Sequence, residues 1–350
     1  METGMTHVRA ALDIGSGATK MTLARVSADG GATTILHSSQ VELLLRHDLQ
    51  TVRAATGEAR LSDAAIAELT ATLCEYAKIA REAARAADLP LRMRGVATAV
   101  FRSATNGEAA LDAAASTATI ECRIIDQTME GRLGYATAVA VAPTWLCDII
   151  SWDSGGGSFQ ISDAIGHVWE GPLGSSSMLQ LMAERAQGRE IAGGDLTSNP
   201  ATLVECETCA RFAREAIGAP PDWLRGVARR EQPLVAIGGA TCAFRMAQLA
   251  CAGVEAGVEA LGSAEVWRAI ARLTGQSDHA LAGAGFPQAF MLLPKLILVA
   301  VVLEALSEHS DVAGVADDDE SRCGESNIRF VYCSTNGSTN GMLAEAAVWD

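Results

Sequence analysis

The sequence predicts an α/β fold in which one domain is duplicated. A strand, a glycine-rich turn and two further strands occur twice, once around Asp13 and once around Asp153, and alternating helices and strands follow each set. The length of 350 residues suits two domains of ordinary size. A repeat on this scale indicates a duplicated domain, because the units of a solenoid repeat about every 20 to 50 residues.

The first half of the chain alternates between strand and helix patterns. In its opening stretch, VRAALDIGSGATKMTLARV, apolar and polar residues alternate and glycines mark the turns. Ser62 is a good N-cap for a long helix, and Asn106 and Thr128 are the expected caps of two later helices. The first predicted strand ends near Asp13, and the other strands cover 19–26, 33–38, 92–100 and 121–126. The predicted helices cover 62–89, 107–118 and 128–142.

The second half repeats the pattern. Three strands are predicted within 145–174, further strands at 233–239 and 327–333, and a terminal helix from about Gly337. The most apolar run, FMLLPKLILVAVVLEAL, is interrupted by Pro294 and Lys295, so it is shorter than the about 20 residues that span a bilayer. It predicts a buried core helix.

Composition narrows the classes of function. Hydrophobic residues make up 49% of the chain and charged residues 20%, which is typical of a globular protein. The net charge of −15 argues against general affinity for nucleic acid or an anionic membrane. The nine scattered cysteines indicate reduced thiols, and the polar amino terminus has no secretory signal. We therefore expect a cytoplasmic protein.

Two glycine loops are the strongest candidates for a binding site. DIGSGATK, residues 13–20, is followed by an alternating strand, whereas a dinucleotide fingerprint or a P-loop would open a helix. The turn that remains is a nest of amide groups suited to phosphate oxygens. The second loop, DSGGGS, matches it in place. The predicted phosphate ligands are Ser16, Gly17, Lys20, Gly155, Gly156, Gly157 and Ser158.

The acidic residue before each glycine loop is a candidate metal ligand. Asp13 and Asp153 each end a strand, where a carboxylate can hold hydrated Mg²⁺ together with phosphate oxygens. The alternative is that both loops are ordinary hairpin turns.

Two charged residues of the first half allow two interpretations each. Arg102 follows an apolar strand, where a guanidinium could grip a phosphate or simply lie on the surface. Glu130 lies in the first turn of a predicted helix, where it could act as a general base or stabilise the helix end.

Three other charged or cysteine-containing segments favour structural interpretations. Cys206 and Cys209 form a CxxC motif inside a helical pattern and have no second pair at zinc-site spacing. The acidic run 317–320 is typical of a solvated loop. A basic cluster, Arg225, Arg229 and Arg230, is explained equally well by a solvated loop.

Six motifs in chain order resemble those of the exopolyphosphatase/guanosine pentaphosphate phosphohydrolase (Ppx/GppA) family, which belongs to the superfold of actin, the sugar kinases and the Hsp70 ATPase. Each motif is weak alone, but six in the right order are specific. They are DIGSGATK, ATAVFRSATNG, IIDQTMEGRLGYA, DSGGGSFQIS, GPLGSSSM and VAIGGATCAFRMAQLA.

The resemblance implies a fold and a mechanism. The fold would be two actin-like, ribonuclease H-like domains, 1–143 and 144–337, around a central cleft, with a helix at about 338–350 packed back on the first domain. An exopolyphosphatase would release terminal orthophosphate from inorganic polyphosphate with Mg²⁺ as cofactor. Glu130 would activate water, Asp153 and Asp13 would hold the metal, and Arg102 and Gly239 would bind phosphate. Family members are often dimers, so a homodimer is expected.

Departures from the family motifs leave other functions open. Gln160 stands where the family has a glutamate, and Gly17–Ala18 replace Asn-Ser. The segment STNG, 338–341, lacks the arginine of the family's closing motif. The alternatives are a guanosine pentaphosphate phosphohydrolase and a non-catalytic sensor that binds nucleotide or polyphosphate. A kinase of the same superfold is disfavoured, since AIGGAT is the sole adenosine-like segment.

Overall fold

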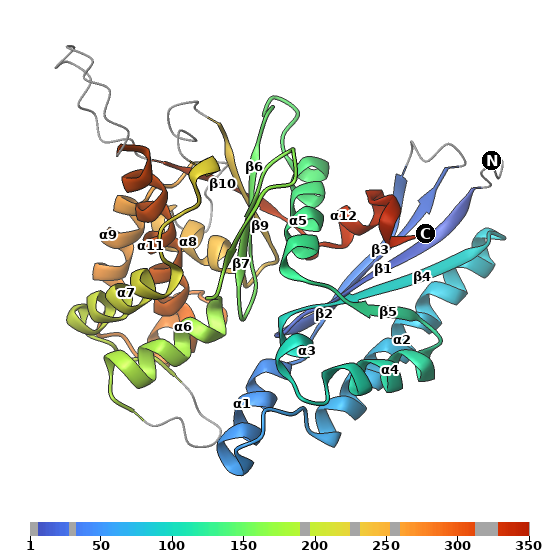
Figure 1. The fold of residues 1–350 in the computed structure, drawn as a ribbon, viewed down its shortest axis with the longest axis horizontal. Coiled ribbons are helices and arrows are strands. Elements are labelled where there is room, and N and C mark those ends of the chain that lie inside the picture. Colours follow the sequence, from blue (N-terminus) through green and yellow to red (C-terminus); the bar gives the residue numbers. More distant parts are fainter. Residues whose placement is uncertain are drawn as a thin grey trace. The chain divides into compact units, whose positions relative to one another are not determined.

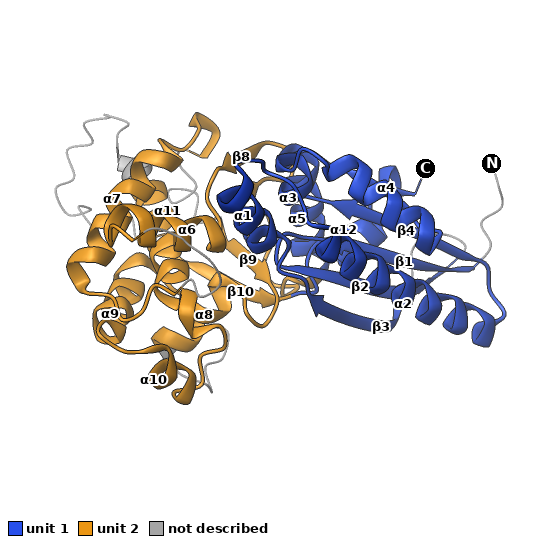
Figure 2. Ribbon diagram, turned by 90° about the horizontal axis from the view of Figure 1, so that it is seen from below, with its two compact units in different colours: residues 1–140, 155–157, 335–350 blue, residues 141–154, 158–334 orange. Residues whose placement is uncertain are grey.

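The computed structural model describes residues 6–27, 33–189, 197–224, 232–252, 260–311 and 328–349. The chain forms two compact units (Figure 1, Figure 2). Unit 1 consists of Met1–Ala140, Gly155–Gly157 and Thr335–Asp350, and unit 2 of Val141–Ser154 and Ser158–Ser334. The acidic run 317–320 and the cluster Arg225, Arg229 and Arg230 lie outside the described residues.

Each unit contains a five-stranded sheet with the same strand order. In unit 1 the order is β3-β2-β1-β4-β5, and in unit 2 it is β8-β7-β6-β9-β10. The first three strands of each unit are antiparallel neighbours, and the last two run parallel to the first. The repeated topology confirms the duplicated α/β fold. The strands are β1 His7–Ile14, β2 Ala18–Val26, β3 Thr33–Glu42, β4 Leu91–Ala97, β5 Glu121–Ile124, β6 Ile150–Ser154, β7 Phe159–Ser162, β8 Val168–Gly171, β9 Leu234–Gly238 and β10 Phe330–Ser334.

Both faces of the unit 1 sheet are covered by helices (Figure 1). Val8, Ala10 and Leu12 of β1 are buried in one core with helices α2 and α4. Ala11 belongs to the other core, with α5 and α12. Alternate residues of one strand thus serve two cores, as the period of a strand requires. The helices are α1 Leu45–Thr56, α2 Asp63–Ala87, α3 Ala99–Ser103, α4 Gly107–Ala118, α5 Gln127–Val141 and α12 Thr339–Ala344, with a 3-10 turn η5 at Ala346–Val348.

The sequence predictions for unit 1 miss the helices α1 and α3 and need three corrections at element ends. The strand expected at 92–100 stops at Ala97, and α3 begins two residues later. The expected cap Asn106 does not cap α4, because its side chain hydrogen bonds to both backbone groups of Leu61. At the start of α5 it is Asp126 Oδ1 that accepts the Met129 N–H, at 2.7 Å, and not the predicted Thr128. The N-cap Ser62 is as predicted.

The core of unit 2 is built around α11. The residues from Leu296 to Leu303 are fully buried, which confirms the predicted core helix. The stretch Ala289–Ser307 is long and apolar enough to cross a membrane, but 83% of its most apolar window is buried inside the protein. The helices are α6 Ser175–Leu181, a π-helical turn η1 Met182–Ala186, α7 Leu203–Ile217, α8 Ala243–Ala252, α9 Ser263–Leu273, α10 Asp278–Gly283 and α11 Leu292–Asp311, with 3-10 turns η2 Asp222–Leu224 and η3 Ala289–Met291.

The CxxC pair lies on the buried face of α7. Burial raises the pKa of Cys206 and of Cys209 to about 12, so both stay neutral thiols near neutral pH. Among the described residues no group of three or more His, Cys, Asp or Glu side chains could hold a metal ion. The neutral, buried thiols agree with a structural role for the pair.

Candidate active site

The first glycine loop joins β1 to β2 and brings four predicted site residues together. The Gly15 N–H donates to Ala18 O at 3.0 Å and closes the turn. The register of the hairpin pairs Asp13 with Lys20, whose Nζ lies 3.9 Å from Asp13 Oδ2. Ser16, at the tip, is 5% exposed. Asp13, Ser16, Gly17 and Lys20 therefore share one end of the unit 1 sheet.

A segment near the carboxy terminus covers this loop. The Ser338 N–H donates to Asp13 Oδ2 at 3.0 Å, and Asn336 Nδ2 donates to Met21 O at 2.8 Å. Gly337 has a φ of 63°, and a Cβ at this position would collide with Asp13 Oδ2 and with the Lys20 side chain. Gly337 is therefore required both for its left-handed backbone and for its lack of a side chain. The Asn336–Gly337 pair is a turn signal in the sequence, but no local pattern connects it with Asp13.

The predicted base and the predicted phosphate-binding arginine form an ion pair. Arg102 Nη2 lies 2.9 Å from Glu130 Oε2, and Arg102 Nη1 donates to Ile125 O at 2.6 Å. Both side chains are largely buried, at 23% and 14% exposure. Arg102 comes from α3 and Glu130 from the first turn of α5, so the pair ties these helices together. The charge of Arg102 is thus already balanced by a carboxylate.

The second glycine loop begins where β6 ends. Asp153 lies opposite Gln160 on the β6–β7 hairpin. Gln160 is 1% exposed, and its Nε2 donates to Ser158 Oγ at 3.2 Å. The strand is anchored by Trp152, whose ring packs edge-on against Phe244 with centroids 4.7 Å apart. The neutral Gln160 is therefore a buried support for Ser158.

A third loop, Gly238–Cys242, connects β9 to α8 and contains the predicted phosphate ligand Gly239. Tyr332 Oη donates to Gly238 O at 3.0 Å and to Gly239 O at 3.3 Å. In a trans peptide the N–H opposes the C=O. The amides of Gly239 and Ala240 therefore point away from Tyr332, side by side, as an anion-binding nest requires.

Lys295, from α11, supports the same loop. It is 2% exposed, and its Nζ donates to Thr241 O at 2.6 Å and to Gln288 Oε1 at 2.7 Å. Burial raises the pKa of the Cys242 thiol; Lys295 lowers it and Asp153 raises it. Asp153 and Lys295 thus both lie within electrostatic reach of this loop. The sequence signal for Lys295 was a lysine in the middle of an apolar run.

The carboxylates of Asp13 and Asp153 fit a metal site in which the protein supplies few of the ligands. Each unit supplies one candidate, Asp13 or Asp153, at the end of a strand beside a glycine loop. Mg²⁺ is commonly held by one or two carboxylates, with phosphate oxygens and water as the other ligands. This donor set fits a cation that arrives with a phosphorylated substrate, since the protein alone offers few oxygens.

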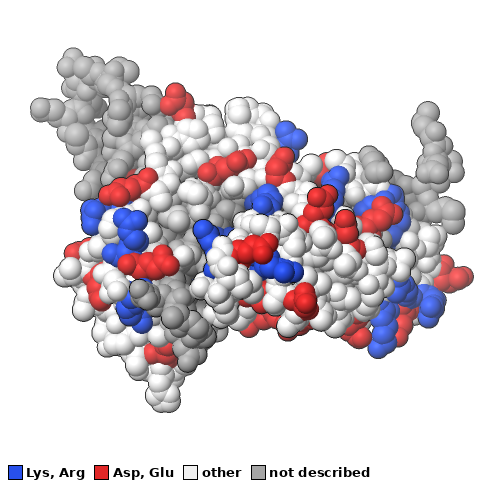
Figure 3. All heavy atoms as spheres, turned by 60° about the horizontal axis from the view of Figure 1, so that its bottom comes forward, with Lys and Arg blue, Asp and Glu red and all other residues white. Residues whose placement is uncertain are grey.

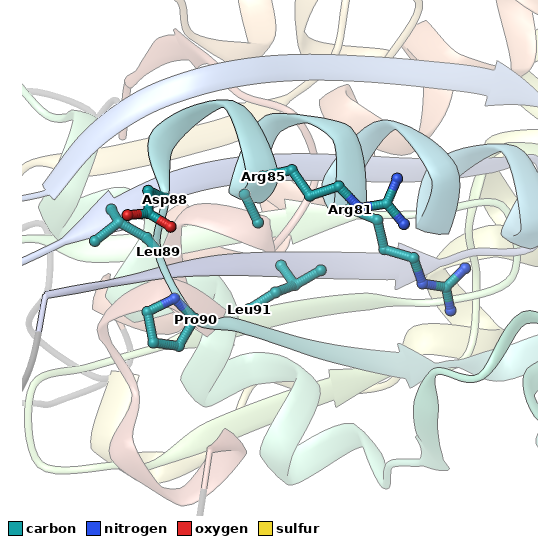
Figure 4. A pocket seen from close by; sticks show the side chains of 7 residues that line it. Arg81, Arg85, Asp88, Leu89, Pro90 and Leu91 are labelled. Atoms are coloured by element: carbon teal, nitrogen blue, oxygen red, sulfur yellow. The ribbon is translucent and has the colours of Figure 1, made fainter.

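A separate hollow lies in unit 1 at the end of α2 (Figure 4). Arg81 and Arg85 extend along the helix away from Asp88. The neighbouring Pro90 O accepts the Val8 N–H at 2.8 Å, so the hollow is at the start of β1, whereas Asp13 is near its end. The hollow is therefore not part of the candidate site. Acidic and basic side chains are interspersed on the face drawn in Figure 3.

Comparison with known families finds one match. The model of the Ppx/GppA phosphatase family matches residues 22–178. This range contains Arg102, Glu130, Asp153 and the second glycine loop, whereas Asp13–Lys20 and Gly239 lie outside it. No curated protein sequence matches the chain. The family match agrees with the resemblance seen in the sequence over residues 22–178.

Solved structures share the fold over nearly the whole chain. The Ppx/GppA enzyme of Aquifex aeolicus has a TM-score of 0.65 at 18% identity, covering 97% of this chain and 99% of that one. An exopolyphosphatase-like protein has a TM-score of 0.68 at 19% identity, covering 97% of both chains. An exopolyphosphatase from Cytophaga hutchinsonii has a TM-score of 0.65 at 12% identity, covering 96% of both chains. These likenesses confirm the actin-like fold of this family.

Proposed function

Because residues 22–178 match the Ppx/GppA phosphatase family and the fold is that of its solved members, we propose that this chain is a Mg²⁺-dependent phosphohydrolase of the exopolyphosphatase type. Its substrate is inorganic polyphosphate, from which it releases terminal orthophosphate. The single observation that carries the proposal is the partly buried Arg102–Glu130 pair, which holds a carboxylate within the family-matched part of unit 1.

In the proposed reaction the oxygen of a water molecule attacks the terminal phosphorus, and the bridging P–O bond breaks toward the shortened chain. Glu130 accepts the proton of the attacking water. Arg102 fixes the direction of the Glu130 carboxylate, since it binds both Oε2 and the backbone carbonyl of Ile125. The amide groups of the glycine loops and Lys20 bind the phosphate oxygens. Bound Mg²⁺, held by Asp13 or Asp153, would neutralise developing charge on those oxygens.

The test is orthophosphate release from medium-length polyphosphate, with and without Mg²⁺. We expect Mg²⁺-dependent release by the wild type and a fall of at least about 100-fold in Glu130→Gln, the usual contribution of a general base. Glu108→Gln is the matched control, because Glu108 also lies in the first turn of a helix but is exposed. Equal rates for wild type and Glu130→Gln would remove Glu130 as the base.

Gln160 supports a second candidate, a sensor that binds polyphosphate or a guanosine phosphate without efficient hydrolysis. Its buried amide replaces a family glutamate and donates to Ser158. Binding without phosphate release by the wild type, with release gained in Gln160→Glu, would favour the sensor. Assays with guanosine pentaphosphate as substrate separate the two substrate classes.

We infer a cytoplasmic homodimer without nucleic-acid or membrane partners, in line with the acidic sequence and its scattered thiols. Light scattering of the purified chain measures the dimer directly; a monomeric mass at micromolar concentration would contradict it.

A further inference from the structure

Arg102 and Lys20 are the two basic residues of unit 1 that the sequence predicts as phosphate ligands, and each is paired with a carboxylate. Arg102 binds Glu130, and Lys20 lies 3.9 Å from Asp13. A phosphoryl group at the first glycine loop carries several negative charges, and charge-assisted hydrogen bonds to a guanidinium are the strongest that a protein offers it. Another cation beside the loop would therefore complete the site.

Arg46 lies at this loop. It is in the first turn of α1, and its backbone N–H donates to Ser16 O at 2.9 Å. The Leu43 N–H donates to Gly17 O at 3.2 Å, so the start of α1 is fixed against the tip of the loop. Since the Ser16 carbonyl points toward Arg46, the Gly17 N–H of the same peptide points the opposite way.

The guanidinium of Arg46 is poorly satisfied by the protein. Its Nη1 lies 3.5 Å from Ser103 Oγ, at the limit of a hydrogen bond. Its Nε is buried and has no hydrogen-bond partner among the described residues. Burial, and to a lesser degree the charge of Arg53, lowers the pKa of Arg46. Buried donors in native proteins nearly always have a partner, so the missing one points to a ligand.

The second glycine loop leaves room beside Arg46. Gly157 belongs to unit 1, and a Cβ at Gly157 would stand 3.6 Å from Arg46 Nη1 and 3.5 Å from Ala99 Cβ. A larger side chain would fill the space in front of the guanidinium. The absence of a side chain keeps a charged group accessible to a phosphate oxygen.

We propose that Arg46 is a phosphate-binding residue of this site, where its guanidinium donates hydrogen bonds to a phosphoryl group held at the Ser16–Gly17 loop. The ligand class is a linear phosphoanhydride with at least two adjacent phosphoryl groups. The inference rests on the proposed function and supplies the cation that the Arg102–Glu130 pair does not provide.

The test compares Arg46→Met with Arg46→Lys and with Arg53→Met, an exposed arginine on the same helix. Protection by tripolyphosphate against thermal unfolding, measured without Mg²⁺, gives the dissociation constant independently of activity. For Arg46→Met we expect that constant and the KM for polyphosphate to rise about tenfold or more, as for the loss of one charge-assisted contact. Arg46→Lys keeps the charge but not the planar fork, so it should recover part of the affinity. Arg53→Met should bind as the wild type does.

The ligand-free protein gives a second readout. If Arg46 is held for a ligand, Arg46→Met removes a buried unsatisfied donor and the melting temperature stays equal or rises. A lower melting temperature with unchanged tripolyphosphate affinity would assign Arg46 a structural role and overturn the proposal. So would a wild type that does not bind tripolyphosphate. Binding that depends on Arg46 without hydrolysis by the wild type would uphold Arg46 and contradict the proposed enzymatic function.

Discussion

Gly337 illustrates how one residue without a side chain can shape a charged site. Its left-handed backbone turns the chain so that the next N–H, that of Ser338, reaches Asp13 Oδ2. The same oxygen lies 3.9 Å from Lys20 Nζ. Asp13 is therefore held through one oxygen by Lys20 of the same hairpin and by the distant Ser338, and its orientation depends on both.

Gly337→Ala should destabilise the protein more than an ordinary glycine replacement does. The new Cβ would strain the positive φ and collide with Asp13, and we expect a loss of about 2–3 kcal/mol in the free energy of unfolding. Gly57→Ala is the control, because Gly57 has a φ of 79° but nothing within 4 Å of its Cβ position. It should lose about 1 kcal/mol. Urea denaturation measures both; equal losses would mean that Asp13 and Lys20 move aside freely.

At the scale of single elements, burial in helix α7 determines the protonation state of two cysteine thiols. Cys206 and Cys209 are fully buried on its inner face, and desolvation raises the pKa of each from 9.0 to about 12. The unfolded chain therefore loses these protons at lower pH than the folded chain. Their contribution to stability is complete below about pH 9 and is lost as pH rises toward 12.

We expect the wild type to lose stability between pH 8 and pH 10.5 more steeply than Cys206→Ala/Cys209→Ala. The difference should be on the order of 4 kcal/mol, because each of the two buried thiols contributes about 2 kcal/mol over about one and a half pH units above its unfolded pKa. Guanidinium denaturation across this range measures the slopes, with Cys147→Ala as the exposed-thiol control. Parallel curves for the wild type and the double variant would show that the thiols titrate alike when folded and unfolded.

Local signals in the sequence predicted most elements but not every contact. α2 was predictable, because Ser62 caps it and apolar residues recur with helical spacing up to Pro90. α1 was not, because Leu44 at its N-cap provides no side-chain hydrogen bond and follows an apolar run that reads as strand. Arg46 lies in the first turn of α1, so no sequence signal marked it as a candidate site residue. The Arg102–Glu130 pair joins residues 28 positions apart, and no local pattern encodes such a contact.

At the scale of the whole molecule, the chain enters unit 2, leaves it and completes unit 1 last. The returning segment buries Met342, Leu343 and Trp349 against the unit 1 sheet. Trp349 is 1% exposed, its Nε1 donates to Met342 O at 2.6 Å, and Arg9 lies 4.7 Å above its ring. Arg92 and Arg123 donate to the carbonyls of Trp349 and Ala347. The duplicated fold thus depends on residues that lie outside the duplicated pattern.

Trp349→Ala should cost about 3–5 kcal/mol of stability, the usual loss when a fully buried aromatic side chain is removed. The loss should come with weaker Mg²⁺ activation, because the same segment contains Ser338 and Gly337. Trp145→Ala is the control, since Trp145 is 68% exposed, and it should leave both quantities unchanged. A melting temperature of Trp349→Ala within about 2 °C of the wild type would contradict the buried placement.

The order of synthesis gives the returning segment a further meaning. A ribosome must translate all of 158–334 before residues 335–349 emerge, so unit 2 can fold while unit 1 still lacks its last layer. A nascent chain stopped before Thr335 has a glycine loop and an Asp13 carboxylate, but no Ser338 N–H to hold that carboxylate. Unit 1 is therefore completed only after unit 2 has been translated, and a chain truncated in unit 2 has no completed Asp13 site.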